Sequence, residues 1–361
     1  MRKSISIIAM LCLVIFFTGA SCVTFSSDNK SPATGPVGMF TSADKGETWR
    51  QIAALPTFEG VKSISGVGVY RIVEDPSDPD AMYLLSRENG LFFTYDNGEA
   101  WQRVSKTLNS GFIYGLAVHP KNRCQIFATN GMQVFRSDDC SRSWAEMYRE
   151  SRADVRISSL AFNQFPPYQL FLAEQNGDLF ESFDSGNSWT VNSRLGTALI
   201  QIVPSPLKAG LIYLITRETG FYRSDDSGKT WNSMGDKLSQ FSQANKYRRY
   251  LLHASKPDTF YWVSTYGILR SDDKGETWKA MELLTPPGSA EIYGFAVNPQ
   301  NENEIYYIAT ISDRSTFYKT MDGGKNWITK KLPSGQIPVY LRVHEKNANV
   351  LFLGFTSLPK K

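Results

Sequence analysis

The chain has 361 residues, which is long for one ordinary domain and favours a repeat architecture or two domains. Aromatic residues make up 13% and charged residues 20% of it, a balance that suits a packed globular protein and argues against disorder. The formal charge is +4, and without Arg2 and Lys3, which lie in an expected signal segment, 37 of the 39 basic side chains face 35 acidic ones. This near-neutral balance gives nucleic-acid binding no compositional support.

Residues 1–21 have the pattern of a lipoprotein-type signal peptide. A short basic segment, Arg2 and Lys3, is followed by an apolar run over residues 5–17. This run is shorter than the roughly 20 residues that a membrane-spanning helix needs. Small residues then precede Cys22 and resemble a bacterial lipobox, with Gly19 where that pattern usually has Leu. We expect an exported protein on the cell surface or the periplasmic side of a membrane, anchored by a lipid on Cys22, with residues 22–36 as a flexible tether. The alternative is cleavage near Ala20 by ordinary signal peptidase, which leaves a free Cys22 thiol.

One pattern, Ser/Thr-x-Asp-x-Gly-x-x-Trp, occurs seven times along the rest of the chain. Its Asp and Trp residues are Asp44 and Trp49, Asp96 and Trp101, Asp139 and Trp144, Asp184 and Trp189, Asp226 and Trp231, Asp273 and Trp278, and Asp322 and Trp327. The third copy has Ser141 in place of the Gly. Successive Trp residues are 42 to 52 positions apart, and seven of the eight Trp in the protein belong to the pattern, so the copies are a true repeat.

Each copy predicts a hairpin turn. The Asp side chain can accept hydrogen bonds from N–H groups of its own turn, the Gly supplies a positive φ, and the Trp is large enough to fill the gap between neighbouring sheets. Two apolar runs precede each copy and are separated by turns such as Asp75-Pro76 and His119-Pro120. Each unit therefore has four antiparallel strands, A to D, with the motif in the C–D turn. Seven such units predict an all-β, seven-bladed β-propeller.

The two ends of the repeat region complement each other. The first copy has a C strand at residues 37–40 and no A or B strand before it, whereas runs at 338–343 and 350–355 follow the last copy unpaired. Together they make one blade. We therefore expect a propeller over residues 37–357, closed by pairing of N- and C-terminal strands, and a tail at 358–361.

Alignment of the A strands on the turn that follows them gives two columns. The first is apolar and contains Ile72, Leu116, Leu160, Ile202, Phe295 and Leu341. The second is small or polar and contains Arg71, Gly115, Ser159, Gln201, Gly294 and Tyr340. This alternation is what the period of two in crowded inner strands requires. The unit around His253 fits the columns less well.

The cysteines Cys124 and Cys140 flank one hairpin, whose turn lies near Gly131. Folding of that hairpin brings them together, so we expect a disulfide in an oxidising compartment; the alternative is two buried thiols. Because Cys140 lies in the copy that has Ser141 for Gly, we infer that the cross-link supports that turn.

The seven copies resemble the Asp-box, or BNR, repeats of sialidases, xyloglucan hydrolases, sortilin receptors and photosystem II assembly and stability factors, over about residues 37–357. The resemblance implies the fold and leaves the function open. Sortilin-type propellers have ten blades and a Cys-rich module, and xyloglucan hydrolases usually join two propellers. One seven-bladed, lipid-anchored propeller looks most like the assembly-factor group, which implies a non-catalytic protein that binds partners on one face with arginines. We expect a monomer.

The alternative class is a sialidase- or xyloglucanase-like glycoside hydrolase. The segment Tyr70-Arg71-Ile72-Val73 is the nearest match to the sialidase Phe/Tyr-Arg-Ile-Pro motif, but it lacks the Pro and follows the first copy of the repeat. Other hydrolases need two carboxylates at a set separation, for which Glu88 and Glu218 are candidates. We predict no catalytic residue, no cofactor and no metal, because the histidines fit turn positions and the Asp225–Gly228 segment lacks the spacing of a calcium loop.

In this layout the D–A and B–C loops share the face opposite the repeat motifs. Loops on a rigid scaffold commonly carry function, and Arg and Tyr are common interface anchors. We expect a protein or glycan partner on this face; the alternative is a solvated rim. The candidate residues are Arg71, Arg87, Glu88, Arg217, Glu218, Arg248, Tyr266 and Arg314.

Overall fold

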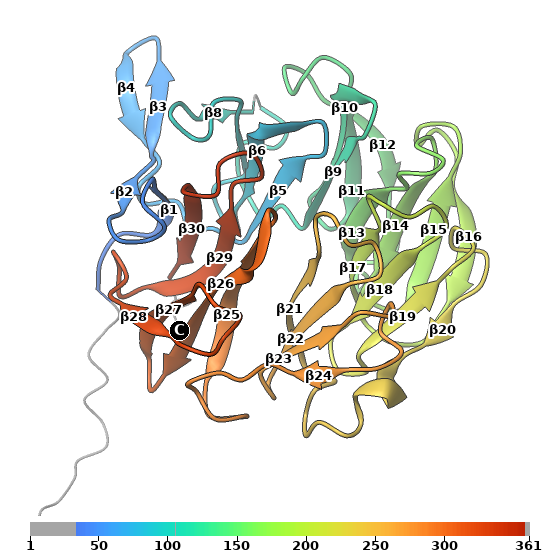
Figure 1. Cartoon of the computed structure of the whole chain (residues 1–361). Helices are drawn as coiled ribbons and strands as arrows, with labels where there is room; N and C mark the ends of the chain where they lie inside the picture. The colour runs from blue at the N-terminus through green and yellow to red at the C-terminus, as the bar shows by residue number, and fades with distance from the viewer. Residues whose placement is uncertain (1–33, 105, 358–361) are drawn as a thin grey trace, which may run out of the picture. The chain divides into compact units, whose positions relative to one another are not determined.

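The computed structural model describes residues 34–104 and 106–357 and is almost entirely β-structure. Its strands form seven antiparallel sheets of four strands arranged in a ring, as predicted, and we call these sheets blades 1 to 7 (Figure 1). The predicted signal peptide, Cys22 and the tail at 358–361 lie outside the described residues. Within them, the helical segment η1 (Gly235–Leu238) has four residues, and no helix has the length and apolarity needed to cross a membrane.

Blade 1 takes strands from both ends of the chain, in the order β29 (Ile337–Val343), β30 (Leu351–Thr356), β1 (Gly38–Ser42) and β2 (Arg50–Gln51). Blades 2 to 4 are built from β5 (Arg71–Asp75), β6 (Asp78–Leu85), β7 (Leu91–Thr94) and β8 (Gln102–Arg103); β9 (Gly115–His119), β10 (Asn122–Thr129), β11 (Gln133–Ser137) and β12 (Ala145–Arg149); and β13 (Ile157–Phe162), β14 (Leu170–Glu174), β15 (Asp178–Ser182) and β16 (Thr190–Arg194). Blades 5 to 7 are built from β17 (Leu199–Pro204), β18 (Ile212–Thr216), β19 (Phe221–Ser224) and β20 (Asn232–Ser233); β21 (Tyr247–Leu252), β22 (Phe260–Ser264), β23 (Ile268–Ser271) and β24 (Lys279–Ala280); and β25 (Glu291–Asn298), β26 (Asn301–Ile311), β27 (Arg314–Thr320) and β28 (Ile328–Lys330).

The ring closes where the sequence predicted. Strand β1 pairs with β30 over five residues, from Gly38 opposite Phe355 to Ser42 opposite Leu351, and β2 pairs on its other side. Phe40 and Phe355 meet edge to face, with ring centroids 5.5 Å apart. One blade is thus shared by the two ends of the chain.

The two columns of the inner strands are present. All six residues of the apolar column are buried, with exposed fractions of 8% or less. In blade 6 the corresponding positions are filled by Tyr250 and Arg249, three and four residues before His253. Blade 6 therefore departs from the pattern by placing an aromatic and a charged residue on its innermost strand.

The seven repeat motifs form turns with the same hydrogen bonds. In the first, the Ser42 hydroxyl donates to Asp44 (2.7 Å) and accepts from the Gly46 N–H (2.8 Å), and Asp44 accepts from the Thr48 N–H (2.9 Å). A Cβ at Gly46, which has φ 83°, would lie 2.7 Å from the Phe317 ring of blade 7. This glycine is needed both for the turn and for close packing of adjacent blades.

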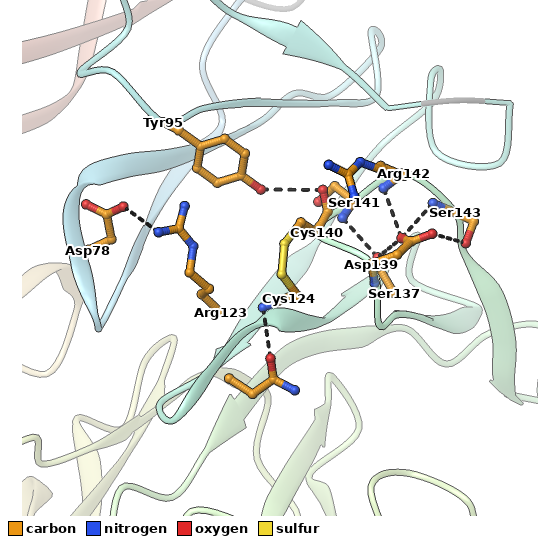
Figure 2. The surroundings of a disulfide bond; sticks show 11 residues. Asp78, Tyr95, Arg123, Cys124, Ser137, Asp139, Cys140, Ser141, Arg142 and Ser143 are labelled. Carbon is orange, nitrogen blue, oxygen red and sulfur yellow. Dashed lines mark hydrogen bonds and ion pairs between the residues drawn. A yellow bond between two sulfur atoms is a disulfide. The ribbon is translucent and has the colours of Figure 1, made fainter.

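The third turn keeps these bonds without a glycine. The Ser141 N–H donates to Ser137 Oγ (2.9 Å), although Ser141 has φ 70°, a conformation that costs most non-glycine residues free energy. A disulfide joins Cys124 on β10 to Cys140 in this turn, and the Tyr95 hydroxyl of blade 2 donates to the Cys140 carbonyl (3.4 Å) (Figure 2). The cross-link therefore ties the turn that has a side chain in the glycine position to the neighbouring strand.

One element was not expected from the sequence. The connection from β2 to β5 contains a separate hairpin, β3 (Ala54–Thr57) and β4 (Gly60–Ser63). Figure 1 shows it standing clear of the blades beside β8 and β2. Only the Gly60 in its turn signalled it, because its strands are too exposed to show an apolar pattern.

Deletion of residues 338–361 should abolish cooperative folding. It removes β29 and β30 and uncovers β1, and the buried Phe352, Leu353 and Phe355 alone contribute about 1.5–3 kcal/mol each. That loss is comparable with the whole stability of a domain, about 5–15 kcal/mol. Urea unfolding followed by tryptophan fluorescence measures it, with deletion of residues 358–361 alone as the control that should leave the midpoint unchanged. An unchanged cooperative transition in the longer deletion would contradict closure by these strands.

Candidate binding face

Antiparallel pairing divides the ring into two faces. The A–B and C–D turns, with the repeat motifs, form what we call the turn face, and the D–A and B–C loops form the loop face. All eight candidate residues lie at the loop face. They are in the β6–β7 loop (Arg87, Glu88), in the β18–β19 loop (Arg217, Glu218), in the β22–β23 loop (Tyr266), and at or near the first residue of β5 (Arg71), β21 (Arg248) and β27 (Arg314).

Arg249 crosses the centre of the ring. Its guanidinium donates to the carbonyls of Tyr293 in blade 7 (3.0 Å) and Val339 in blade 1 (2.6 Å), and to the Arg248 carbonyl (3.0 Å). Burial lowers the pKa of Arg249, and it forms no ion pair with a carboxylate of the described residues. The centre of the ring thus holds a cation whose charge is balanced only by backbone dipoles.

Polar side chains of the inner strands also form hydrogen bonds between blades. The Gln201 amide donates to the Tyr250 hydroxyl (2.9 Å), which bridges blades 5 and 6. The Tyr340 hydroxyl donates to Glu74 (2.6 Å), and burial raises the pKa of that tyrosine well above its usual value. Glu74 is also paired with Arg342 (3.0 Å), so it is neutralised within its own site.

The Arg87 guanidinium lies over two aromatic rings, one of which is also close to Arg71. Its guanidinium carbon lies 5.0 Å from the Tyr70 ring centroid and 5.2 Å from that of Phe112. Tyr70 meets Phe112 edge to face (4.7 Å), and Phe112 stacks on Tyr114 (3.9 Å). The connections that lead into β5 and β9 therefore present cations over half-buried rings at the loop face.

The arginines of the two faces differ in their partners. On the turn face, arginines pair with carboxylates: Arg50 with Glu99, Arg123 with Asp78, Arg136 with Asp138, Arg223 with Asp225 and Glu276, and Arg270 with Asp272 and Glu302. On the loop face, seven arginines have no ion pair with a carboxylate of the described residues: Arg71, Arg87, Arg103, Arg156, Arg217, Arg249 and Arg314. Four other loop-face arginines do have carboxylate partners: Arg149 with Glu146, Arg152 with Glu150, Glu174 and Asp178, Arg194 with Asp178, and the predicted candidate Arg248 with Glu291 at 2.7 Å. The loop face therefore carries paired arginines together with a set of arginines that have no carboxylate partner among the described residues.

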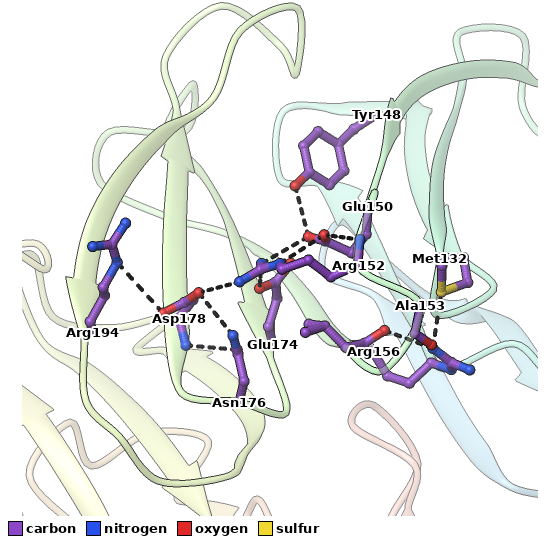
Figure 3. A network of polar contacts seen from close by, with 11 residues as sticks. Met132, Tyr148, Glu150, Arg152, Ala153, Arg156, Glu174, Asn176, Asp178 and Arg194 are labelled. Carbon is purple, nitrogen blue, oxygen red and sulfur yellow. Dashed lines mark hydrogen bonds and ion pairs between the residues drawn. The ribbon is translucent and has the colours of Figure 1, made fainter.

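Arg152 joins three carboxylates at the loop-face ends of blades 3 and 4 (Figure 3). It donates to Glu150 (2.9 Å), Glu174 (2.6 Å) and Asp178 (2.9 Å), and the Tyr148 hydroxyl donates to Glu150 (3.2 Å). Burial, and then the hydrogen bond with Glu150, raises the pKa of Glu174 to about 8, whereas the Arg152 hydrogen bonds lower the pKa of Glu150. Burial and the neighbouring Glu150 therefore favour the protonated form of Glu174.

The histidines occupy turn positions, as the sequence indicated. Nδ1 of His119 accepts from the Lys121 N–H (3.0 Å) and Nδ1 of His253 from the Ser255 N–H (3.1 Å), so each ring caps an A–B turn. Burial lowers the pKa of both. Within the described ranges, no group of three or more His, Cys, Asp or Glu side chains is arranged to hold a metal ion.

Sequence reasoning found most of this face but missed Arg249. It selected Arg248, whose side chain is neutralised, and passed over the next residue. The signal that could have found Arg249 was the misfit of the His253 unit, because a charged residue in an inner-strand column must point toward the ring centre or a neighbouring blade.

Comparison with known proteins supports the fold. No protein family model matches the chain. The GH74 xyloglucanase from Xanthomonas campestris is 16% identical, with a TM-score of 0.61 over 86% of this chain and 52% of that one. YCF48 bound to a D1 peptide is 14% identical, with a TM-score of 0.56 over 82% of this chain and 99% of that one. Sortilin of Rattus norvegicus is 24% identical over 197 residues, 48% of this chain and 22% of sortilin.

These similarities place the chain among propellers of two different functional groups. The chain spans between 10% and 22% of the length of the curated relatives that it matches. It spans nearly the whole of YCF48 but about half of the xyloglucanase. At this level of identity the likeness shows the seven-bladed fold alone.

Glu174→Gln should stabilise the protein at alkaline pH. The folded pKa of about 8 exceeds the unfolded value of about 4.5, so the folded state holds a proton that the unfolded state releases between these values. Stability is thus lost as the pH rises from about 4.5 to 8. Gln does not titrate. Between pH 5 and pH 9 we therefore expect the free energy of unfolding of the variant to rise relative to that of the native chain by on the order of 1–4 kcal/mol. Urea unfolding across that range measures it, and parallel pH profiles would contradict the assignment of the proton to Glu174.

Proposed function

We propose that this protein is an exported, lipid-anchored, non-catalytic propeller that binds a protein segment rich in carboxylates on its loop face. The observation that carries the proposal is a set of seven loop-face arginines without a carboxylate partner among the described residues, whereas five turn-face arginines are paired with carboxylates. A charge-assisted hydrogen bond contributes about 1.5–3 kcal/mol, and bidentate pairing of Arg with a carboxylate adds geometric specificity.

The shape of the site fits an extended partner. Arg87 and the Tyr70–Phe112–Tyr114 rings form its outer part, and Arg71 and Arg249 lead to the ring centre. Arg and Tyr are enriched among residues that dominate binding energy. The YCF48 neighbour, which has the same fold, is seen bound to a D1 peptide, which is consistent with a peptide or protein partner for this chain. A glycan on the same face is the alternative partner.

A second candidate function is hydrolysis of an extracellular glycan, and the likeness to the GH74 xyloglucanase favours it. A glycosidase needs two carboxylates about 5–10 Å apart across its pocket. On the loop face, Glu150, Glu174 and Glu291 are each held by an arginine, and the predicted candidates Glu88 and Glu218 have no ion pair among the described residues. Release of reducing ends from xyloglucan oligosaccharides that is lost in Glu88→Gln or Glu218→Gln would replace the binding proposal with this one.

Arg87→Ala combined with Arg217→Ala should reduce partner binding by about tenfold or more, since two charge-assisted contacts are lost. Arg123→Ala is a matched control, because Arg123 lies 5.2 Å from the Tyr95 ring centroid but on the turn face. The measurement is quantitative capture of host membrane proteins by the purified chain, at low and high salt. Equal recoveries with the double variant and the control would contradict binding at the loop face.

The mature N-terminal peptide should begin at Cys22 and carry the mass of attached acyl chains. Mass spectrometry of that peptide measures it directly, and Cys22→Ala should remove the added mass. A free Cys22 thiol, or an N-terminus created near Ala20, would contradict the anchor while leaving the binding proposal intact.

A further inference from the structure

The tip of the β3–β4 hairpin presents two apolar side chains to solvent. Phe58 has an exposed fraction of 111% and Val61 of 75%, which are the highest values among the large apolar residues of the described ranges. All four residues of β4 are exposed. A large aromatic ring that stays in solvent at a projecting tip does not stabilise the fold. Its position therefore suggests contact with a partner outside this chain.

The hairpin holds these side chains in a defined position. Its strands pair from Ala54 opposite Ser63 to Thr57 opposite Gly60, and the Thr57 hydroxyl donates to the Gly60 carbonyl (2.8 Å). At its base, the Trp101 N–H of blade 2 donates to the Ala54 carbonyl (2.8 Å). Phe58 is therefore carried by a paired and attached hairpin rather than by a loose loop.

The base of the hairpin also contacts the point where the chain enters the first strand. The Gln51 side chain donates to the Val37 carbonyl (2.8 Å) and to the Ser65 carbonyl (3.5 Å), which follows β4. Fifteen residues separate Cys22 from Val37, and at full extension they span about 50 Å. A lipid on Cys22 would hold the base of the hairpin within that distance of the bilayer.

We propose that this hairpin tip docks on the surface of the bilayer that carries the anchor, with Phe58 and Val61 entering the interfacial layer. The inference rests on the lipid anchor of the proposed function. A thin tip with two apolar side chains lacks the area of about 800 Å² per partner that a specific protein interface usually buries, whereas a bilayer interface accepts apolar groups without a matching pocket. Anchor and hairpin together then fix the orientation of the ring, so that the loop face is presented at a constant angle.

The charges of the hairpin specify how it binds. Glu59 and Lys62 form an ion pair with each other, so the tip adds no net charge. Association through apolar burial alone is insensitive to salt, unlike attraction of a basic patch to anionic lipid. Only the tip enters, so that the N–H and C=O groups of the unpaired strand edges stay hydrated.

Photo-crosslinking identifies directly what the tip of the β3–β4 hairpin contacts. The full chain carries Phe58→p-benzoylphenylalanine, with Phe183→p-benzoylphenylalanine as the control, because Phe183 is exposed on the turn face of blade 4. After illumination of membranes from expressing cells, we expect phospholipid adducts at position 58 and none at position 183. Protein adducts at position 58, or equal lipid adducts at both positions, would overturn the proposal.

Flotation separates the hairpin from the anchor. The mature chain with Cys22→Ser is mixed with vesicles of phosphatidylcholine and phosphatidylglycerol. We expect Phe58→Asp with Val61→Asp to lower its partition by about tenfold, Phe183→Asp to leave it unchanged, and high salt to leave it unchanged. Equal partition of the Cys22→Ser chain and the double variant would overturn the hairpin inference, whereas absence of acyl mass on native Cys22 would overturn only the anchor.

Discussion

Insertion of β1 between β30 and β2 is the interaction on which the rest of the ring depends. Each blade buries both faces against its neighbours, so a ring with one incomplete blade would expose apolar faces on both sides of the gap. The pairing brings Phe40 and Phe355 into contact and closes the ring with residues more than 300 positions apart. Long-range closure of this kind makes the N- and C-terminal segments equal parts of the fold.

The repeat motifs support that closure from the turn face. Each motif binds its own turn through the Ser or Thr hydroxyl and the Asp carboxylate, and its Trp lies against the adjacent blade, as Trp49 does against Phe317 (5.8 Å). Their polar groups are therefore occupied within the turns. Five turn-face arginines are likewise paired with carboxylates.

The loop face differs from the turn face because the repeat motif does not specify which residues stand there. Blade 6 replaces the usual inner-strand pair with Arg249 and Tyr250, which puts an unneutralised guanidinium at the ring centre. Arg71 and Arg87 extend the positive charge outward over Tyr70. The fold supplies a rigid frame at one face and leaves the other for recognition, and the β3–β4 hairpin adds a third, outward-facing feature beside the entry of the chain.

The sequence by itself determined the seven blades, their four-stranded composition and the shared closing blade, because a repeat spaced by 42 to 52 residues and a period of two are local signals. It also assigned the eight candidate residues to one face of the ring, since antiparallel pairing fixes the end of a sheet to which each loop belongs. Only the tertiary structure decided which charges are neutralised: Arg248 is paired with Glu291, Arg249 reaches the carbonyls of two other blades, and burial beside Glu150 raises the pKa of Glu174. These outcomes depend on which side chains from distant blades meet and how much water they lose, and neither quantity is encoded in any short stretch of the chain.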